Sequence, residues 1–146
     1  MNYKRVDDKI FISVDKGEYI NQKLLEVAEY ESITSGWISG LGAISDVEVA
    51  YYEIDEKVYV KKKYNDDYEL LSLTGNVTLL NQKPFIHTHI SFSDTKFNAY
   101  GGHLFDAKVI AACELLILSA PYTINRKLNC NIGLSLWDIK NEYKNN

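Results

Sequence analysis

Three histidines have the residue types and spacing to do chemistry, and the chain contains no others: His87, His89 and His103. In an extended strand, side chains two residues apart project from one face, about 6–7 Å apart, so His87 and His89 could reach one ion. A third imidazole, from the glycine turn at 100–103, would complete a three-nitrogen site. Such a site suits zinc or another divalent transition metal, and it leaves a fourth tetrahedral position open.

A His-x-His pair alone is a weak signal, because two exposed histidines on a solvated strand face would have the same spacing. The third histidine favours the metal site. The alternate positions Ile86, Thr88, Ile90 and Phe92 would form a mostly apolar opposite face. We therefore expect the histidines to share a polar face.

Two acidic residues could accept a hydrogen bond from a ligand histidine, namely Asp94 and Glu114. Glu114 lies within the otherwise apolar run 109–118, where a buried, unpaired carboxylate would be costly. It could orient a ligand histidine, or it could be exposed or form a salt bridge between subunits. Both interpretations stay open at this point.

Composition limits the class of protein. The 146 residues, 46% of them hydrophobic, predict a single domain with a core at about 8–138 and a polar tail at 140–146.

No apolar run is long enough for a membrane span, and we expect a cytoplasmic protein. Cys113 and Cys130 form no Cys-x-x-Cys pair and are expected to be buried and reduced. The net charge of −4 argues against direct capture of nucleic acid.

The positioning elements follow from hydrophobic periodicity. Helical spacing predicts an amphipathic helix over 18–31. The glycine-interrupted stretch 34–44 indicates a strand that ends in a backbone that must bend tightly or approach another segment closely. Strands are predicted at 10–14, 46–54, 58–64, 69–80, 85–92, 109–118 and 134–139, with a hairpin connection at 81–84. This order predicts an α+β fold, with a mainly antiparallel sheet covered by the helix.

An ordered series of motifs resembles the PPC (plants and prokaryotes conserved) domain over about residues 8–138. The motifs are Gly40-Leu41-Gly42-Ala43, Tyr51-Tyr52, the segment 69–76, Pro84-x-x-His87-x-His89, Ser93-Asp94 and Gly101-Gly102-His103-Leu104. The resemblance implies an α+β fold, a homotrimer and, as in prokaryotic members, a metal site at the three histidines.

The resemblance also implies a surface for protein partners. In plants the domain follows an AT-hook and contacts transcription factors through a segment that matches Tyr68-Glu69-Leu70-Leu71. This sequence has no Arg-Gly-Arg core, so direct DNA binding is not expected. Two positions depart from the family pattern. Asn129 replaces an acid that follows Arg126, and the segment 95–100 is bulkier than the family's loop, which would alter access to the metal.

Three functions remain. The first is a metal-containing homotrimer that acts as an assembly and partner-binding module in DNA-linked regulation, without binding DNA tightly itself. The second is a small zinc enzyme of the hydrolase or lyase type, since a three-histidine zinc brings the pKa of bound water to about 7. Its acid or base would come from Asp94, Asp106 or Glu114. The third is structural zinc whose fourth ligand comes from another subunit.

Overall fold

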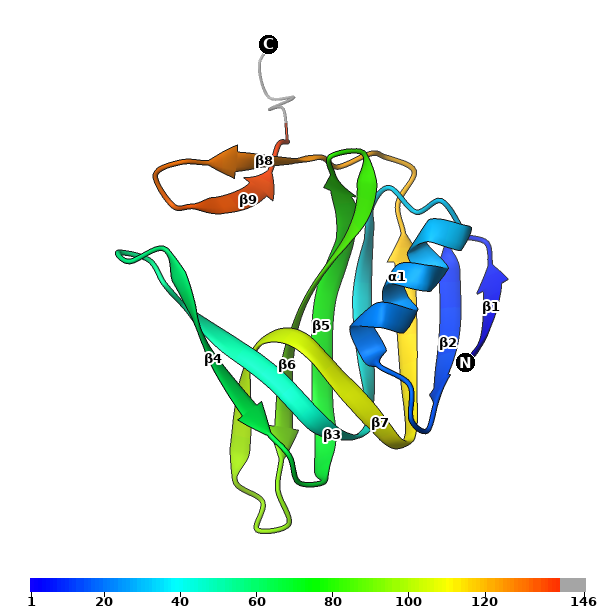
Figure 1. Ribbon diagram of the computed structural model, residues 1–146. Coiled ribbons are helices and arrows are strands. Elements are labelled where there is room, and N and C mark those ends of the chain that lie inside the picture. The colour runs from blue at the N-terminus through cyan, green and yellow to red at the C-terminus, as the bar shows by residue number, and fades with distance from the viewer. Residues whose placement is uncertain (140–146) are drawn as a thin grey trace, which may run out of the picture.

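The computed structural model describes residues 1–139, and the predicted polar tail lies outside them (Figure 1). It contains a mostly antiparallel sheet and one helix within these residues. In chain order the elements are β1 (Asn2–Val6), β2 (Lys9–Asp15), α1 (Ile20–Tyr30), β3 (Gly36–Glu53), β4 (Val58–Tyr64), β5 (Tyr68–Leu80), β6 (Lys83–Ser93), β7 (Ala99–Ser119), β8 (Arg126–Asn129) and β9 (Leu134–Trp137).

The large sheet has the strand order β1-β2-β7-β6-β5-β3-β4, and β7 also pairs with β3. Strands β3, β5, β6 and β7 therefore form a closed circuit of antiparallel pairs. Strands β8 and β9 form a separate hairpin, which Figure 1 shows beside one end of the sheet. The predicted hairpin connection after β5 is confirmed, with a turn at Asn81 and Gln82 where both residues adopt positive φ.

Two strands are much longer than the sequence predicts. The expected end of a strand within 34–44 is wrong, because β3 continues through the glycines with a shift in register between Gly40 and Gly42. The close approach to another segment is confirmed, since a Cβ atom at Gly42 would stand 2.5 Å from the carbonyl oxygen of Ala112. The expected glycine turn before His103 is also wrong, since Gly101 and Gly102 lie within β7. A Cβ atom at Gly101 would stand 2.5 Å from the carbonyl oxygen of Ile90, so glycine is needed there for close strand pairing.

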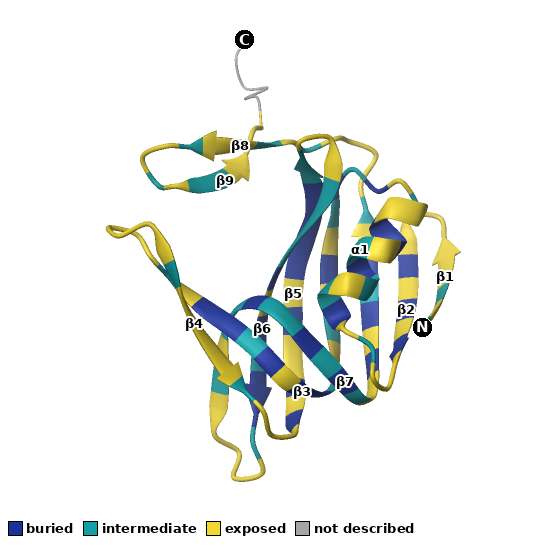
Figure 2. Cartoon of the chain, in the orientation of Figure 1, coloured by how far each residue is buried: buried dark blue, intermediate teal, exposed yellow. Residues whose placement is uncertain are grey.

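Helix α1 contributes one apolar stripe to the core. Its buried residues Ile20, Leu24, Val27 and Ala28 belong to the same hydrophobic cluster as the inward residues of the sheet. Along the strands, buried residues alternate with exposed ones, as Figure 2 shows. The predicted combination of one helix with a mainly antiparallel sheet is confirmed. That the helix covers a whole face of the sheet stays a prediction. No helix in the described part of the chain has the length and apolar character needed to cross a membrane.

A side chain of α1 fixes the strand that carries two of the histidines. Asn21 donates hydrogen bonds to the carbonyl oxygens of Leu104 and Phe105, and its Oδ1 accepts one from Thr88 Oγ1 at 2.8 Å. Thr88 is buried and lies between His87 and His89 on the opposite face of β6. The helix therefore holds β6 and β7 together directly behind the histidines.

The free cysteines differ in environment. Cys113 is buried in the core, as expected, and burial raises the pKa of its thiol to about 11. Cys130 is exposed, so its predicted burial is wrong, because it lies in the turn between β8 and β9.

Replacing Gly75 with alanine should lower the free energy of unfolding by about 1–3 kcal/mol, the usual cost of overpacking. The new Cβ would stand 2.3 Å from the carbonyl oxygen of His87 and 2.9 Å from Thr88 Cα, so β6 would have to move. Urea unfolding midpoints measure the effect, with Thr74→Ala at an exposed neighbouring position as control. Equal stability of the two variants would contradict this account of the strand contact.

Candidate metal centre

Strand pairing brings the three histidines together from two strands. His87 and His89 lie on β6, where they pair with Asn76 and Thr74 of β5. His103 lies on β7 directly opposite His89. Directly paired residues of an antiparallel ladder point to the same face, so all three imidazoles share one side of the sheet.

The three rings converge closely. Their centroids are 5.1 Å apart for His87 and His89, 5.1 Å for His87 and His103, and 5.3 Å for His89 and His103. Each ring offers one nitrogen to a group whose nitrogens all lie within 4.8 Å of one another. No other group of three or more ligand side chains is found within residues 1–139.

The spacing of two of these nitrogens fits a tetrahedral metal ion. Nε2 of His87 and Nε2 of His89 are 3.3 Å apart. Two nitrogens at about 2.0–2.1 Å from a tetrahedral ion are separated by about 3.3–3.4 Å. Imidazole nitrogens are ligands that zinc and neighbouring transition metals accept. The side chains present therefore suit such an ion, with one coordination position left over.

Burial keeps the imidazoles neutral. It is the main cause that lowers the pKa of His87 to about 4, and the charges of His103, Arg126 and His89 act in the same direction. The pKa of His103 falls to about 4, chiefly through burial and then through His89 and Arg126. Burial also lowers the pKa of His89. Metal ions bind the neutral form of histidine, so the ligands need little deprotonation at neutral pH.

Aromatic rings line one side of the three-histidine site. The ring of Tyr59 stacks on His103 at 5.0 Å between centroids and with 28° between planes. Phe105 makes an edge contact with both rings. These contacts fix the orientation of His103 and bring β4 to the site.

Arg126 of β8 reaches the site from the separate hairpin. Its Nη2 lies 3.3 Å from His87 Nδ1 and donates to Asn76 Oδ1 at 2.8 Å. At position 129, Asn129 Oδ1 accepts the backbone N–H groups of Asn131 and Ile132. Asn129 thus shapes the turn that follows β8, the strand that carries Arg126.

Asp94 does not contact a ligand histidine in the structure. Its carboxylate accepts hydrogen bonds from the backbone N–H groups of Lys96 and Asn98, from the Asn98 side chain and from the Tyr100 hydroxyl. These bonds, those of Asn98 first, lower the pKa of Asp94 to about 2. The carboxylate organises the β6–β7 loop. Four residue pairs separate His89 and His103 from this loop, so the bulky segment 95–100 lies at the far end of the hairpin.

Glu114 is also placed away from the histidines. It lies on β7 opposite Leu41 of β3 and Ser13 of β2, and its side chain is exposed. Within the single chain Glu114 is therefore exposed, and a salt bridge between subunits stays a prediction. The third acid considered for catalysis, Asp106, accepts the backbone N–H of Asn21 at the start of α1.

The segment predicted to bind partners divides into buried and exposed residues. Tyr68 and Leu70 are buried, and the Tyr68 ring packs edge-on against Phe92. Glu69 and Leu71 are exposed. Only these two side chains could meet a partner without disturbing the core.

Sequence reasoning missed Tyr59 and Asn76, and it noted Arg126 only as part of a motif. No local pattern marks Tyr59, because an aromatic residue on a strand is ordinarily read as a packing residue. The one available signal for a further site residue was Arg126, because Asn129 leaves this cation without the acidic partner of the family pattern. Its position beside His87 depends on how the hairpin meets the sheet.

Replacing Asp94 with asparagine should destabilise the protein in a pH-dependent way. The folded pKa of about 2 lies below the ordinary value of about 3.9, so the carboxylate stabilises the fold above about pH 4. This contribution is lost as the pH falls from about 4 to about 2. The gap in urea midpoint between wild type and variant should therefore be full at neutral pH and close near pH 2. A gap that does not change with pH would contradict the role of the charge.

Comparisons with known proteins agree with this fold. The model of the Plants and Prokaryotes Conserved (PCC) domain matches residues 1–121. A search of curated proteins gave no match.

Three solved structures are similar over almost the whole chain. A metal-containing protein from Archaeoglobus fulgidus is 34% identical, with a TM-score of 0.83, and the match covers 94% of this chain and 98% of that one. A plant- and prokaryote-conserved protein from Pyrococcus horikoshii is 28% identical (TM-score 0.84, 96% and 95% covered). A candidate DNA-binding protein from Bacteroides thetaiotaomicron is also 28% identical (TM-score 0.91, 94% and 96% covered). The chain therefore belongs to the Plants and Prokaryotes Conserved domain family, abbreviated PCC or PPC, which is the family that the sequence motifs resemble.

Proposed function

We propose that this chain is a metal-binding protein that holds a divalent transition-metal ion, zinc in the first place, through His87, His89 and His103. The observation that carries the proposal is the convergence of three neutral imidazoles on one side of the sheet. The similar protein from Archaeoglobus fulgidus, described as metal-containing, supports it. Bound zinc would act as a Lewis acid, with a charge of +2, on a water or ligand at its open coordination position.

Purified protein should bind one equivalent of Zn²⁺, and His87→Ala, His89→Ala and His103→Ala should each weaken binding by at least about a hundredfold. Even groups that only support a ligand contribute about 10–100-fold to affinity. Calorimetric titration, paired with elemental analysis, measures the change. Thr74→Ala is the matched control, because Thr74 is an exposed residue paired with His89. Undiminished affinity in all three histidine variants would refute the site.

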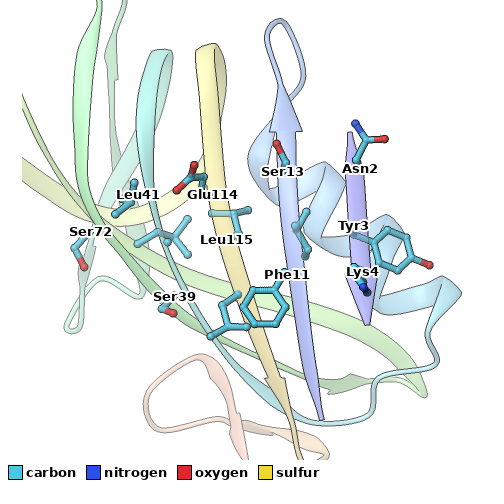
Figure 3. A pocket seen from close by; sticks show the side chains of 14 residues that line it. Asn2, Tyr3, Lys4, Phe11, Ser13, Ser39, Leu41, Ser72, Glu114 and Leu115 are labelled. Atoms are coloured by element: carbon cyan, nitrogen blue, oxygen red, sulfur yellow. The ribbon is translucent and has the colours of Figure 1, made fainter. Parts of the chain in front are cut away.

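The second part of the proposal is that the chain assembles with copies of itself, as a homotrimer. A groove of about 760 Å³ crosses strands β1, β2, β7, β3 and β5 (Figure 3). By register, Phe11 of β2, Leu116 of β7 and Ser39 of β3 are neighbours on its surface. Exposed apolar side chains on this face include Phe11, Trp37, Leu41 and Leu118. An apolar surface spread over adjacent strands is typical of a protein interface.

The charges in the groove support a second copy as its occupant. Lys4 and Glu114 both line it, and neither forms an ion pair among the described residues. Figure 3 shows Glu114 beside Leu41. A surface with apolar residues and both signs of charge can complement another copy of itself in a closed ring. The salt bridge between subunits considered for Glu114 fits this arrangement.

Leu41→Glu should dissociate the assembly into single chains of 16.7 kDa. It would place a second carboxylate beside Glu114 in the interface, where like charges are costly. Sedimentation velocity measures the mass. The control is Tyr30→Glu, which introduces the same charge at an exposed aromatic position on α1, outside the groove. A monomeric wild type, or an assembled Leu41→Glu variant, would refute the interface.

A partner-binding role completes the proposal. Glu69 and Leu71 are the exposed members of the segment 68–71, so they are the side chains through which a protein partner would be recruited. The similar protein from Bacteroides thetaiotaomicron is described as a DNA-binding candidate. For this chain, with a net charge of −4, we propose that contact with DNA depends on a partner.

A small zinc enzyme is the second candidate function. One observation favours it over a purely structural ion: a half-buried guanidinium and a stacked tyrosine stand beside the histidines. Structural metal sites are normally closed by protein ligands, whereas an open position next to polar groups is typical of catalytic sites. The described residues place no carboxylate in an ion pair with the histidines, which leaves Tyr59, whose ring stacks on His103, as the candidate for the group that exchanges a proton.

A further inference from the structure

Arg126 is a half-buried cation held by neutral groups. Its Nε donates to Thr78 Oγ1 at 2.7 Å, its Nη1 to the Ser135 carbonyl at 2.9 Å and its Nη2 to Asn76 Oδ1 at 2.8 Å. The guanidinium also lies over the Phe85 ring, 4.9 Å from its centroid. Burial lowers the pKa of Arg126 accordingly. Together these contacts fix the plane of the guanidinium beside the histidines.

No carboxylate within residues 1–139 forms an ion pair with the positive charge of Arg126. None of the ion pairs within residues 1–139 involves Arg126, His87, His89 or His103. A divalent ion on the histidines would raise the local charge to about +3. A cluster of buried positive charge is costly unless an anion neutralises it. The site is therefore electrostatically incomplete without an anionic ligand.

The contact between Arg126 and His87 carries a second argument. Arginine only donates hydrogen bonds, so His87 Nδ1 must accept in this contact, and the single proton of the neutral ring then resides on Nε2. Coordination through Nε2 requires the lone pair of that nitrogen and moves the proton to Nδ1. The Arg126 N–H would then face another N–H. Because the two nitrogens are only 3.3 Å apart, an acceptor that satisfies both donors would have to approach them from one side.

We propose that the three-histidine site binds a small organic carboxylate, and that Arg126 is the residue that recognises it. This inference rests on the proposed metal site, because one carboxylate oxygen would occupy the open coordination position while the other meets Arg126. One N–H of Nη1 has no partner among these contacts, and one N–H of Nη2 is directed at His87, so these two groups are left to donate to that second carboxylate oxygen. A single arginine favours a singly charged carboxylate over phosphate, which usually has more donors around it. The aromatic rings of Tyr59 and Phe105 would contact the organic part of the ligand.

Arg126 lies outside the residues 1–121 that match the family model. The hairpin that carries it reaches the sheet through a bridge between Leu79 and Asn125 and through the Arg126 contacts themselves. Recognition of the anion would therefore depend on the C-terminal hairpin as well as on the histidine-bearing sheet.

The test uses full-length protein loaded with Co²⁺, whose visible absorption reports on its coordination. Acetate and inorganic phosphate are titrated in separate experiments into wild type, Arg126→Met, Arg126→Lys and the control Lys127→Met on the same strand. Acetate should bind wild type and Lys127→Met equally and more tightly than phosphate. Its affinity should fall about tenfold to hundredfold in Arg126→Met, the effect of losing a charge-assisted hydrogen bond. Arg126→Lys, which keeps the charge but loses the planar fork, should give an intermediate value.

Cobalt content and circular dichroism separate the outcomes. Unchanged Co²⁺ content and a native spectrum in Arg126→Met, together with weaker acetate binding, support the inference. Equal acetate affinity in Arg126→Met and wild type overturns it while the metal site stands. Tighter binding of phosphate than of acetate overturns the carboxylate class. A wild type that binds no Co²⁺ refutes the metal site itself and this inference with it. If Arg126→Met does not fold, the comparison of Arg126→Lys with wild type decides.

Discussion

The pairing of β6 with β7 is the constraint on which the site depends. It sets His89 directly opposite His103, and the two-residue repeat of β6 then adds His87 on the same face. A shift of one residue in this register would turn His103 to the core side and Leu104 to the site. The register is fixed from behind, where Ile90, Phe92 and Leu104 are buried and Thr88 is bonded to Asn21 of α1. The core thus positions the polar face without contacting it.

Closure of the sheet gives the site its walls. Because β7 pairs with both β6 and β3, and β4 continues from β3, the ring of Tyr59 is brought against His103. Burial by these neighbours is what lowers the pKa of the imidazoles, so the same packing that builds the sheet also prepares neutral ligands. Strain is avoided at the tightest strand contacts by Gly75 and Gly101, where a Cβ atom would meet a backbone carbonyl.

Two regions on the same face of the sheet, opposite the core, carry separate functions in our proposals. Phe11, Leu41 and Glu114 lie on the strands at one edge of the closed circuit and form the groove assigned to self-association. The histidines lie on β6 and the first part of β7, with the β8–β9 hairpin beside them. Long bent strands link the two regions, since β7 carries His103 near its start and Glu114 near its end. Assembly and metal binding are therefore built on one continuous strand.

The sequence by itself determined the three histidines as candidate ligand residues, the mainly antiparallel α+β fold and the elements with clear periodicity, because these follow from local spacing and burial. Examples are the helix near 18–31 and the strand at Val58–Tyr64. The sequence also indicated the family through ordered motifs. Only the tertiary structure decided that the glycines at 101 and 102 lie within a strand, that Asp94 and Glu114 serve other regions, and that Arg126 and Tyr59 join the histidines. These outcomes depend on which distant strands pair and in which register, and no local pattern in the chain encodes that choice.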